Sequence, residues 1–189
     1  MLSPVPKISE EQRETRRQEI LAAAQQCFAR HGYEGATVVR LEKATGLSRG
    51  AIFNYFANKE ALFVAVTLQS SDRFVEIWLE HGFRALLEAI AHEDADWLSV
   101  QVESARRVRT DPVFRAEIER VVAERSAARE ERYARLRAQG TIREDVPLPV
   151  VVEFLGLVAN GLAFERVGGG ELPDLDALMT LVETGVARR

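Results

Sequence analysis

Apolar residues between positions 37 and 59 recur with the period of two short helices separated by a turn. Val38, Leu41 and Ala44 are spaced by three residues, which is typical of one face of an α-helix. Gly46 follows this face, and glycine is the residue that most readily ends a helix in a left-handed conformation. The pattern therefore predicts a first helix that ends near Gly46.

Hydroxyl residues stand directly before each of these two helices. Thr37 precedes the first and Ser48 the second, and a side-chain oxygen there can accept a hydrogen bond from a free backbone N–H. The second helix then has Ile52, Phe53 and Phe56 on its apolar side. Two short helices joined by a tight turn form a helix-turn-helix, whose second helix can lie in the DNA major groove.

The same periodicity predicts helices along most of the 189 residues. No run of alternating β-branched residues is long enough for a sheet, so we expect an all-α fold. We expect a three-helix DNA-binding domain over residues 1–60 and a helical effector-binding and dimerisation domain over residues 61–189. The predicted helices lie at about 9–30, 38–45, 49–56, 58–81, 83–91, 97–109, 112–139, 150–167 and 174–186.

The polar side of the second helix carries groups that can read DNA bases. Arg49 can bond guanine and Asn54 can bond adenine, and each bidentate pair provides about 1–3 kcal/mol of base discrimination. Gly50 and Ala51 are small enough to allow close approach to base edges. The alternative is a solvated helical hairpin that never meets DNA. The candidate DNA-binding residues are Arg16, Arg17, Thr37, Val38, Ser48, Arg49, Gly50, Ala51, Asn54, Tyr55 and Lys59.

Three basic residues in this set are candidates for phosphate contacts. Lys59 begins the next helix, where an ammonium group and free N–H groups suit a phosphate. Arg16 or Arg17, near the start of the first helix, can contact a phosphate that flanks the second helix of the motif. The alternative for both arginines is ion pairing in solvent with glutamates such as Glu14 and Glu19.

Charge is distributed unevenly along the chain, whose formal net charge is −4. Residues 1–60 contain nine Lys and Arg against seven Asp and Glu, so this part carries +2; the remainder contains 16 against 22 and carries −6. A mildly basic segment attached to an acidic one is compatible with DNA binding, because the local field governs phosphate contact.

The run Thr37–Phe63, TVVRLEKATGLSRGAIFNYFANKEALF, resembles the amino-terminal DNA-binding domain of the TetR family of regulators. The preceding run RRQEILAAAQQCFARHGYEGATV fits the same pattern, and the likeness spans about residues 13–65. It implies a homodimeric, mostly repressing transcription factor with a variable ligand-binding domain. The helix expected over residues 58–81 would then set the spacing of the two DNA-binding heads. The family often has Tyr where this chain has Phe53, while Tyr55 and Lys59 keep their places.

Short motifs in the second half are similar to the aconitase-repressor branch of the family. DWLSV, RTDPVFRA, DVP and LVETGV follow in a matching order. This branch is associated with sensing citrate together with a divalent cation. The resemblance implies that Arg132 and Glu183 are the polar ligand contacts.

The last two predicted helices are strongly apolar. The helix over residues 150–167 is apolar almost all round, so we expect it to be buried on more than one side. Two such helices can pair with their copies across a two-fold axis as a four-helix bundle, where the TetR resemblance also places the dimer interface. The alternative is that they only complete the core of one chain. Val150–Phe164 is expected to be too short, and too interrupted by Glu153 and Asn160, to span a membrane.

A small-molecule pocket between helices usually has apolar walls and a few placed polar groups. The aromatic residues expected in such walls are Trp78, Phe83, Trp97, Phe154 and Phe164. A carboxylate at Glu183 needs a partner if it is buried. It could form an ion pair between helices or subunits, or it could hold an anionic or metal–carboxylate ligand. The candidate ligand-binding residues are Trp78, Trp97, Arg106, Arg109, Arg132, Asn160 and Glu183.

No catalytic constellation is visible, so we expect no enzyme and no required cofactor. His31, His81 and His92 lack metal-ligand spacing, and phosphate-binding and nucleophile motifs are missing. The lone Cys27 excludes an intrachain disulfide and is expected to be a small buried hydrophobe, with a redox-sensing thiol as the alternative. The first twenty residues are charged rather than apolar, which predicts a cytoplasmic protein. An effector-independent DNA-binding protein of the same fold and a protein-interaction module remain alternatives.

Overall fold

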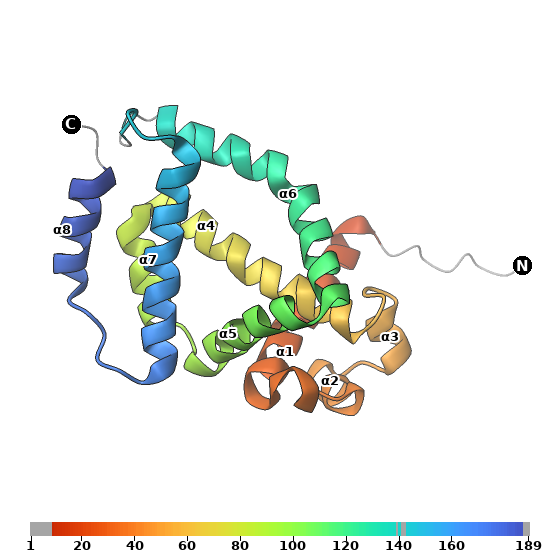
Figure 1. The fold of residues 1–189 in the computed structure, drawn as a ribbon. Helices are drawn as coiled ribbons and strands as arrows, with labels where there is room; N and C mark the ends of the chain where they lie inside the picture. Colours follow the sequence, from red (N-terminus) through yellow and green to blue (C-terminus); the bar gives the residue numbers. More distant parts are fainter. Residues whose placement is uncertain (1–8, 139, 141–142, 187–189) are drawn as a thin grey trace, which may run out of the picture. The chain divides into compact units, whose positions relative to one another are not determined.

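The computed structural model describes residues 9–138, 140 and 143–186; the side chains of residues 103, 125, 126, 128, 129, 132 and 136 lie outside this description. The described residues form helices and no strands, which confirms the all-α prediction (Figure 1). The helices are α1 Glu10–Gly35, α2 Val38–Thr45, α3 Arg49–Phe53, α4 Lys59–Ala91, α5 Ala95–Thr110, α6 Pro112–Ala138, α7 Leu148–Gly168 and α8 Leu175–Val186.

The chain divides into two compact units, Met1–Thr67 and Leu68–Arg189, and α4 runs from the first into the second. Gly82 produces a kink inside α4, since its φ of 87° lies in the left-handed region that glycine adopts without strain. The break in the helix at Gly82 was therefore predicted correctly. The first helix is longer than predicted, because α1 continues through a kink at Gly32 and ends at Gly35.

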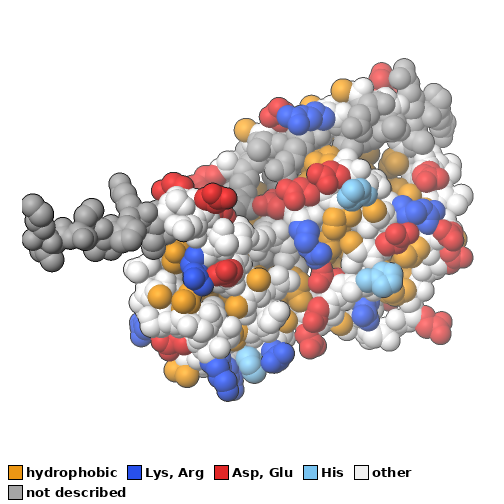
Figure 2. Space-filling view, turned by 180° about the vertical axis from the view of Figure 1, so that it is seen from behind, with side chains coloured by type: hydrophobic (Ala, Val, Ile, Leu, Met, Phe, Trp, Pro, Cys, Tyr) orange, Lys and Arg blue, Asp and Glu red, His pale blue; other side chains and the backbone are white. Residues whose placement is uncertain are grey.

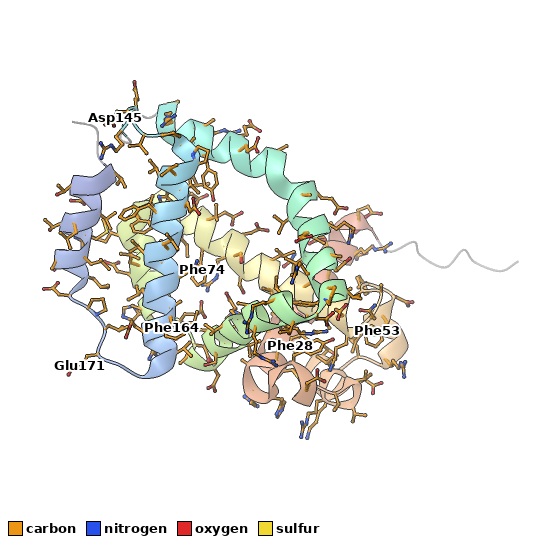
Figure 3. The ribbon with its side chains drawn as sticks, viewed as in Figure 1. Phe28, Phe53, Phe74, Asp145, Phe164 and Glu171 are labelled. Carbon is orange, nitrogen blue, oxygen red and sulfur yellow. The ribbon has the colours of Figure 1, made fainter. Side chains whose placement is uncertain are left out.

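The first unit is built from α1, α2, α3 and the start of α4. The Phe28 ring, labelled in Figure 3, meets the Phe63 ring edge to face at a centroid distance of 5.0 Å. Leu41 of α2 and Ile52 of α3 are fully buried in the same unit. Because α2 and α3 each bury one side, the opposite side of each helix faces outward.

The predicted capping residues begin and end these helices. Thr37 accepts a hydrogen bond from the Arg40 N–H, and Ser48 accepts one from the Ala51 N–H at 3.3 Å. Gly46 ends α2 with a φ of 67°, a conformation that most other residues would adopt only with strain. The helix-turn-helix geometry is therefore specified locally, by residues within the motif.

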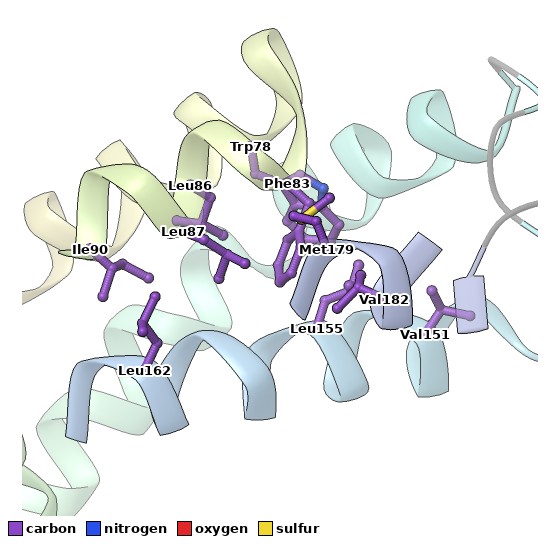
Figure 4. Close-up of a cluster of buried hydrophobic side chains, with 10 residues drawn as sticks. All are labelled: Trp78, Phe83, Leu86, Leu87, Ile90, Val151, Leu155, Leu162, Met179 and Val182. Carbon is purple, nitrogen blue, oxygen red and sulfur yellow. The ribbon is translucent and has the colours of Figure 1, made fainter. Parts of the chain in front are cut away.

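The core of the second unit joins the end of α4 to α7 and α8 (Figure 4). Leu86, Leu87 and Ile90 of α4 belong to this core, together with Leu155 and Leu162 of α7. At the start of α5, Trp97 is buried and its indole N–H donates a hydrogen bond to the Ser70 hydroxyl at 3.1 Å. This bond satisfies the one polar group that a buried tryptophan carries.

Within one chain one side of α7 stays exposed, so the predicted burial on more than one side requires a second copy and stays a prediction. Leu155 is 3% exposed, whereas Leu157 is 66% exposed and Phe164 is 63% exposed. At 21 residues α7 is also longer than Val150–Phe164, and by length and composition it could cross a membrane. The core helix of a globular protein can have the same length and composition, and Leu155 and Leu162 of α7 belong to the core of the second unit.

The burial of α2 yields a prediction about stability. Leu41→Ala should lower the free energy of unfolding by about 2–5 kcal/mol, because Leu41 is 0% exposed. Val39→Ala, two residues away on the same helix and 71% exposed, should change it by less than about 0.5 kcal/mol. Urea unfolding followed by circular dichroism measures both variants, and equal effects would contradict the orientation of α2.

Candidate nucleic-acid interface

The exposed side of α3 carries the residues that were predicted to read DNA bases. Ile52 is fully buried and fixes one side of this helix to the core of the unit. Arg49, Gly50 and Asn54 are exposed, and Ala51 is half-buried. The helix thus presents one guanidinium and one amide beside small residues, which is an arrangement that can approach base edges.

Gly50 is not required by the packing of its own chain. A Cβ built at this position would meet no atom within 4 Å, and its φ is not in the left-handed region. Neither a close neighbour nor a strained backbone therefore explains the glycine. A surface that must approach another molecule closely would explain it, since glycine lets a backbone come nearest to a partner.

The start of α3 is held by two side chains. Ser48 caps it as predicted, and Glu42 of α2 accepts a hydrogen bond from the Arg49 N–H at 2.6 Å. Glu42 was not among the predicted residues. A contact seven residues away across a turn has no helical periodicity, so no local pattern identifies it.

Two arginines of α1 contact the segment that follows α3. The Arg13 guanidinium lies 5.9 Å from the Tyr55 ring centroid, and that of Arg17 lies 5.4 Å from the Phe56 ring centroid. Arg13 was not among the predicted residues, although its i,i+4 spacing from Arg17 places both on one helix face. These cation–π contacts hold two guanidinium groups against the segment that follows α3, in which Tyr55 is half-buried.

The two arginines that were predicted to contact phosphate also form the ion pairs proposed as the alternative. Arg16 pairs with Glu19 at 2.7 Å, and Arg17 lies 3.6 Å from Glu14. Exposed ion pairs contribute about 0–1 kcal/mol, so a phosphate can displace either carboxylate at little cost. The pairs are therefore compatible with both interpretations.

Lys59 is partly engaged inside its own unit. Its ammonium group donates a hydrogen bond to the Tyr33 carbonyl at 2.9 Å and lies 4.2 Å from the Tyr33 ring centroid. Asn58 caps α4 through the Ala61 N–H at 2.8 Å, as the sequence suggested. An ammonium group has three N–H donors, so Lys59 retains donors beyond the one that holds Tyr33.

Thr37 and Val38 lie at the start of α2, where Thr37 is exposed and Val38 is half-buried.

Lys and Arg side chains on the face of the molecule shown in Figure 2 are interspersed with Asp and Glu. The DNA-binding unit itself has few excess positive charges, because residues 1–60 carry only +2. Any attraction to DNA must therefore come from a few well-placed groups.

A cavity of about 250 Å³ lies in the second unit. Trp78, Phe83 and Tyr133 supply aromatic walls, and Gln101 and Asn160 supply amides. The side-chain nitrogen of Gln101 is buried and has no hydrogen-bond partner among the described residues. A cavity that combines apolar walls with an unpaired donor can bind a small molecule.

Several residues that were predicted to line this cavity lie elsewhere. Trp97 is bonded to Ser70 instead, and Phe154 and Phe164 are on the exposed side of α7. Periodicity alone could not show which side of so apolar a helix faces inward. Trp78, Phe83 and Asn160 do line the cavity.

The charged residues that were predicted to bind a ligand also lie outside the lining of this cavity. Arg106 and Arg109 on α5 and Glu183 on α8 are exposed. The side chain of Arg132 lies outside the described residues. Within the described part of the chain Glu183 forms no ion pair, so an ion pair with Arg106 or Arg109 of the same chain is not formed.

Redox and metal chemistry find little support in the described residues. Burial raises the pKa of the Cys27 thiol, an effect that outweighs the lowering by Arg40, Arg30 and Lys59. A redox-sensing thiol needs the opposite shift. No group of three or more His, Cys, Asp and Glu that could hold a metal ion occurs in the described ranges.

The architecture and the exposed α3 define a helix-turn-helix protein. The family described as "Bacterial regulatory proteins, tetR family" matches residues 20–66. The chain is 41% identical to the HTH-type transcriptional repressor AcnR of Corynebacterium diphtheriae, over 96% of this chain and 97% of that protein. It is 40% identical to the HTH-type transcriptional repressor Rv1474c of Mycobacterium tuberculosis, over 97% and 100% of the two chains.

The chain therefore belongs to the TetR family of DNA-binding transcription regulators, within the branch that contains AcnR and Rv1474c. The solved structure of Salmonella enterica GusR has the same fold, with a TM-score of 0.67 and 23% identity over 95% of this chain and 98% of that one. The resemblance identified in the sequence is confirmed.

Proposed function

We propose that this regulator is a homodimeric repressor that binds a palindromic operator through α3 of each protomer. The observation that carries the proposal is that Arg49, Gly50 and Asn54 are exposed while Ile52 of the same segment is fully buried. Arg49 and Asn54 read bases in the major groove, and Gly50 allows α3 to approach them. The bound dimer occludes RNA polymerase in the cytoplasm, where the bacterial chromosome lies.

The remaining candidate residues of the DNA-binding unit orient this unit on the phosphate backbone of DNA. Arg16, Arg17, Tyr55 and Lys59 supply donors for phosphate oxygens, and such contacts fix orientation without reading sequence. Thr37, Val38, Ser48 and Ala51 surround them at the starts of α2 and α3. With a small positive charge on the head, we expect weak binding to DNA of unrelated sequence.

The exposed side of α7 supports a homodimer. Val150, Phe154, Leu157 and Phe164 are all exposed and recur at three-, four- and seven-residue spacing, with Gly161 completing the stripe. An apolar stripe of this kind is typical of an interface between subunits. Leu181 of α8 is 71% exposed and extends the apolar surface, so α7 and α8 pair with their copies across a two-fold axis.

A small molecule that binds the second unit controls the affinity for DNA. The cavity beside Trp78 and Asn160 supports this role. The effector class implied by the branch resemblance is a carboxylate such as citrate with a divalent cation. The resemblance assigns it to Arg132 and Glu183; Glu183 is exposed on α8 and lies outside the lining of the cavity, so a site that includes Glu183 extends beyond that cavity. Citrate carboxylates are oxygen ligands of the kind that a hard divalent cation prefers, so the cation and citrate could bind as one complex.

For the effector to release DNA, it must bind more tightly to a conformation in which the two DNA-binding units of the dimer are wrongly spaced for the operator. Half-sites read by such dimers lie about 34–36 Å apart, so a small change in head spacing spoils the fit. A preference of about 1–3 kcal/mol for that state releases the operator substantially. An effector-independent regulator would show no ligand-induced stabilisation, and a protein-interaction module would retard no DNA even at low salt.

Substitutions in α3 test base readout. Arg49→Ala or Asn54→Ala should lower discrimination between a selected operator and its scrambled form, by about 1–3 kcal/mol for each lost bidentate contact. Tyr55→Phe should instead weaken binding to both duplexes alike, since a phosphate contact carries no sequence information. Fluorescence anisotropy across a salt series measures these affinities. Unchanged base preference in Arg49→Ala would refute the assignment of readout.

Charge placed on the α7 stripe tests the dimer. Leu157→Glu should shift the protein to a monomer, because the interface would bury an unpaired carboxylate. Val113→Glu, at a similarly exposed valine of α6, should leave the dimer intact. Light scattering after size-exclusion chromatography gives the mass of each variant. A wild-type monomer, or a dimeric Leu157→Glu variant, would rule out this interface.

Thermal unfolding tests the effector class. Citrate and Mg²⁺ together should raise the melting temperature by several degrees at concentrations near 100 times Kd, where binding adds about 2.7 kcal/mol. Glu183→Gln should lose this shift, and Glu88→Gln on α4 should keep it. An equal shift in Glu183→Gln would remove Glu183 from the site, and no shift in the wild type would exclude citrate.

A further inference from the structure

Glu42 connects the two helices of the DNA-binding motif. It lies in the last turn of α2, is half-buried, and accepts the Arg49 N–H at 2.6 Å. Arg49 is the first residue of α3. The same residue that carries the exposed guanidinium is therefore held through its backbone by a carboxylate of the preceding helix.

Helix α3 needs this support because it has only five residues. Helices this short are not stable alone, and their first N–H groups have no partner inside the helix. Ser48 accepts the Ala51 N–H, and Glu42 accepts the Arg49 N–H. A side-chain oxygen at this position satisfies a donor that the short helix cannot pair itself, so Glu42 helps to set the direction in which α3 begins.

The carboxylate has a cost for DNA binding. A negative charge beside the surface proposed to face phosphates opposes association with any duplex. It also lies near the carboxy end of α2, where the helix dipole disfavours anions. A neutral residue would avoid both effects. The hydrogen bond to Arg49 is the contact of Glu42 that offsets them.

We propose that Glu42 is a positioning residue for base readout: it fixes the start of α3 and so aims Arg49, while its charge lowers affinity for unrelated DNA. This inference rests on the proposed DNA-binding function. It assigns two separable effects to this side chain. The length of the Glu42 side chain determines discrimination between DNA sequences, and its charge determines the affinity for unrelated DNA.

Two substitutions separate the effect of the length of the Glu42 side chain from the effect of its charge. Glu42→Gln keeps a side-chain oxygen at the same reach without the charge, and Glu42→Asp keeps the charge but is one methylene too short. Glu34→Gln and Glu34→Asp, at an exposed glutamate of α1, are the matched controls. Each full-length variant is titrated against a duplex selected by the wild type from random sequence and against its scrambled form, at several salt concentrations. Thermal unfolding is measured in parallel.

Glu42→Asp should lose about tenfold in the ratio of the two Kd values, equivalent to about 1.4 kcal/mol, with unchanged affinity for the scrambled duplex. Glu42→Gln should keep the ratio and bind the scrambled duplex about threefold more tightly at low salt. Both Glu34 variants should keep the wild-type ratio.

Three results would overturn the inference. If Glu42→Asp discriminates between the two duplexes as well as the wild type does, even with a lower melting temperature, the hydrogen bond between Glu42 and Arg49 only stabilises the fold. Loss of preference at a single base pair in Glu42→Gln would show a direct base contact instead. A loss of discrimination in the Glu34 variants equal to that in Glu42→Asp would make the effect non-specific. A wild type that binds neither duplex refutes the proposed function itself, whereas the other results leave that function standing.

Discussion

Burial of Ile52 is the interaction on which the DNA-binding unit depends. The helix that carries it has five residues, too few to be stable alone, so its orientation comes from one fully buried side chain and from the contacts at its start. With Ile52 inward, Gly50 and Asn54, two residues away on either side, lie on the opposite side of α3, and Arg49 is exposed at the start of the helix. Hydrophobic packing on one side of α3 thus creates the polar surface on the other, and the caps at Thr37 and Ser48 keep α2 and α3 in their register.

The second unit meets a different constraint, an excess of apolar surface. Helix α7 covers its core with Leu155 and Leu162, yet Leu157 and Phe164 remain exposed within one chain. A second copy is the simplest way to cover this stripe, and a two-fold pair is also what a palindromic operator requires. The same unit contains the cavity whose only polar groups, such as Gln101 and Asn160, are uncharged among the described residues. The proposed dimerisation and the proposed effector binding therefore use neighbouring surfaces of α7.

The sequence predicted those features that are local. Helix order, the caps, the left-handed Gly46 and the polar side of α3 follow from residues within one or two turns of each other. Contacts across a turn were not predictable: Glu42 reaches Arg49, and Lys59 reaches the Tyr33 carbonyl, through tertiary geometry that no periodicity encodes. The cavity walls were predicted only in part. On so apolar a helix as α7, the pattern does not distinguish the side that packs from the side that stays exposed.

Methylation interference on the selected operator tests most directly whether two copies of α3 read the major groove. Dimethyl sulfate modifies guanine N7 in the major groove and adenine N3 in the minor groove. The account predicts that N7 methylation blocks binding at two clusters of guanines centred about one helical turn, or a multiple of it, apart. Interference confined to adenine N3, or to a single cluster, would contradict it.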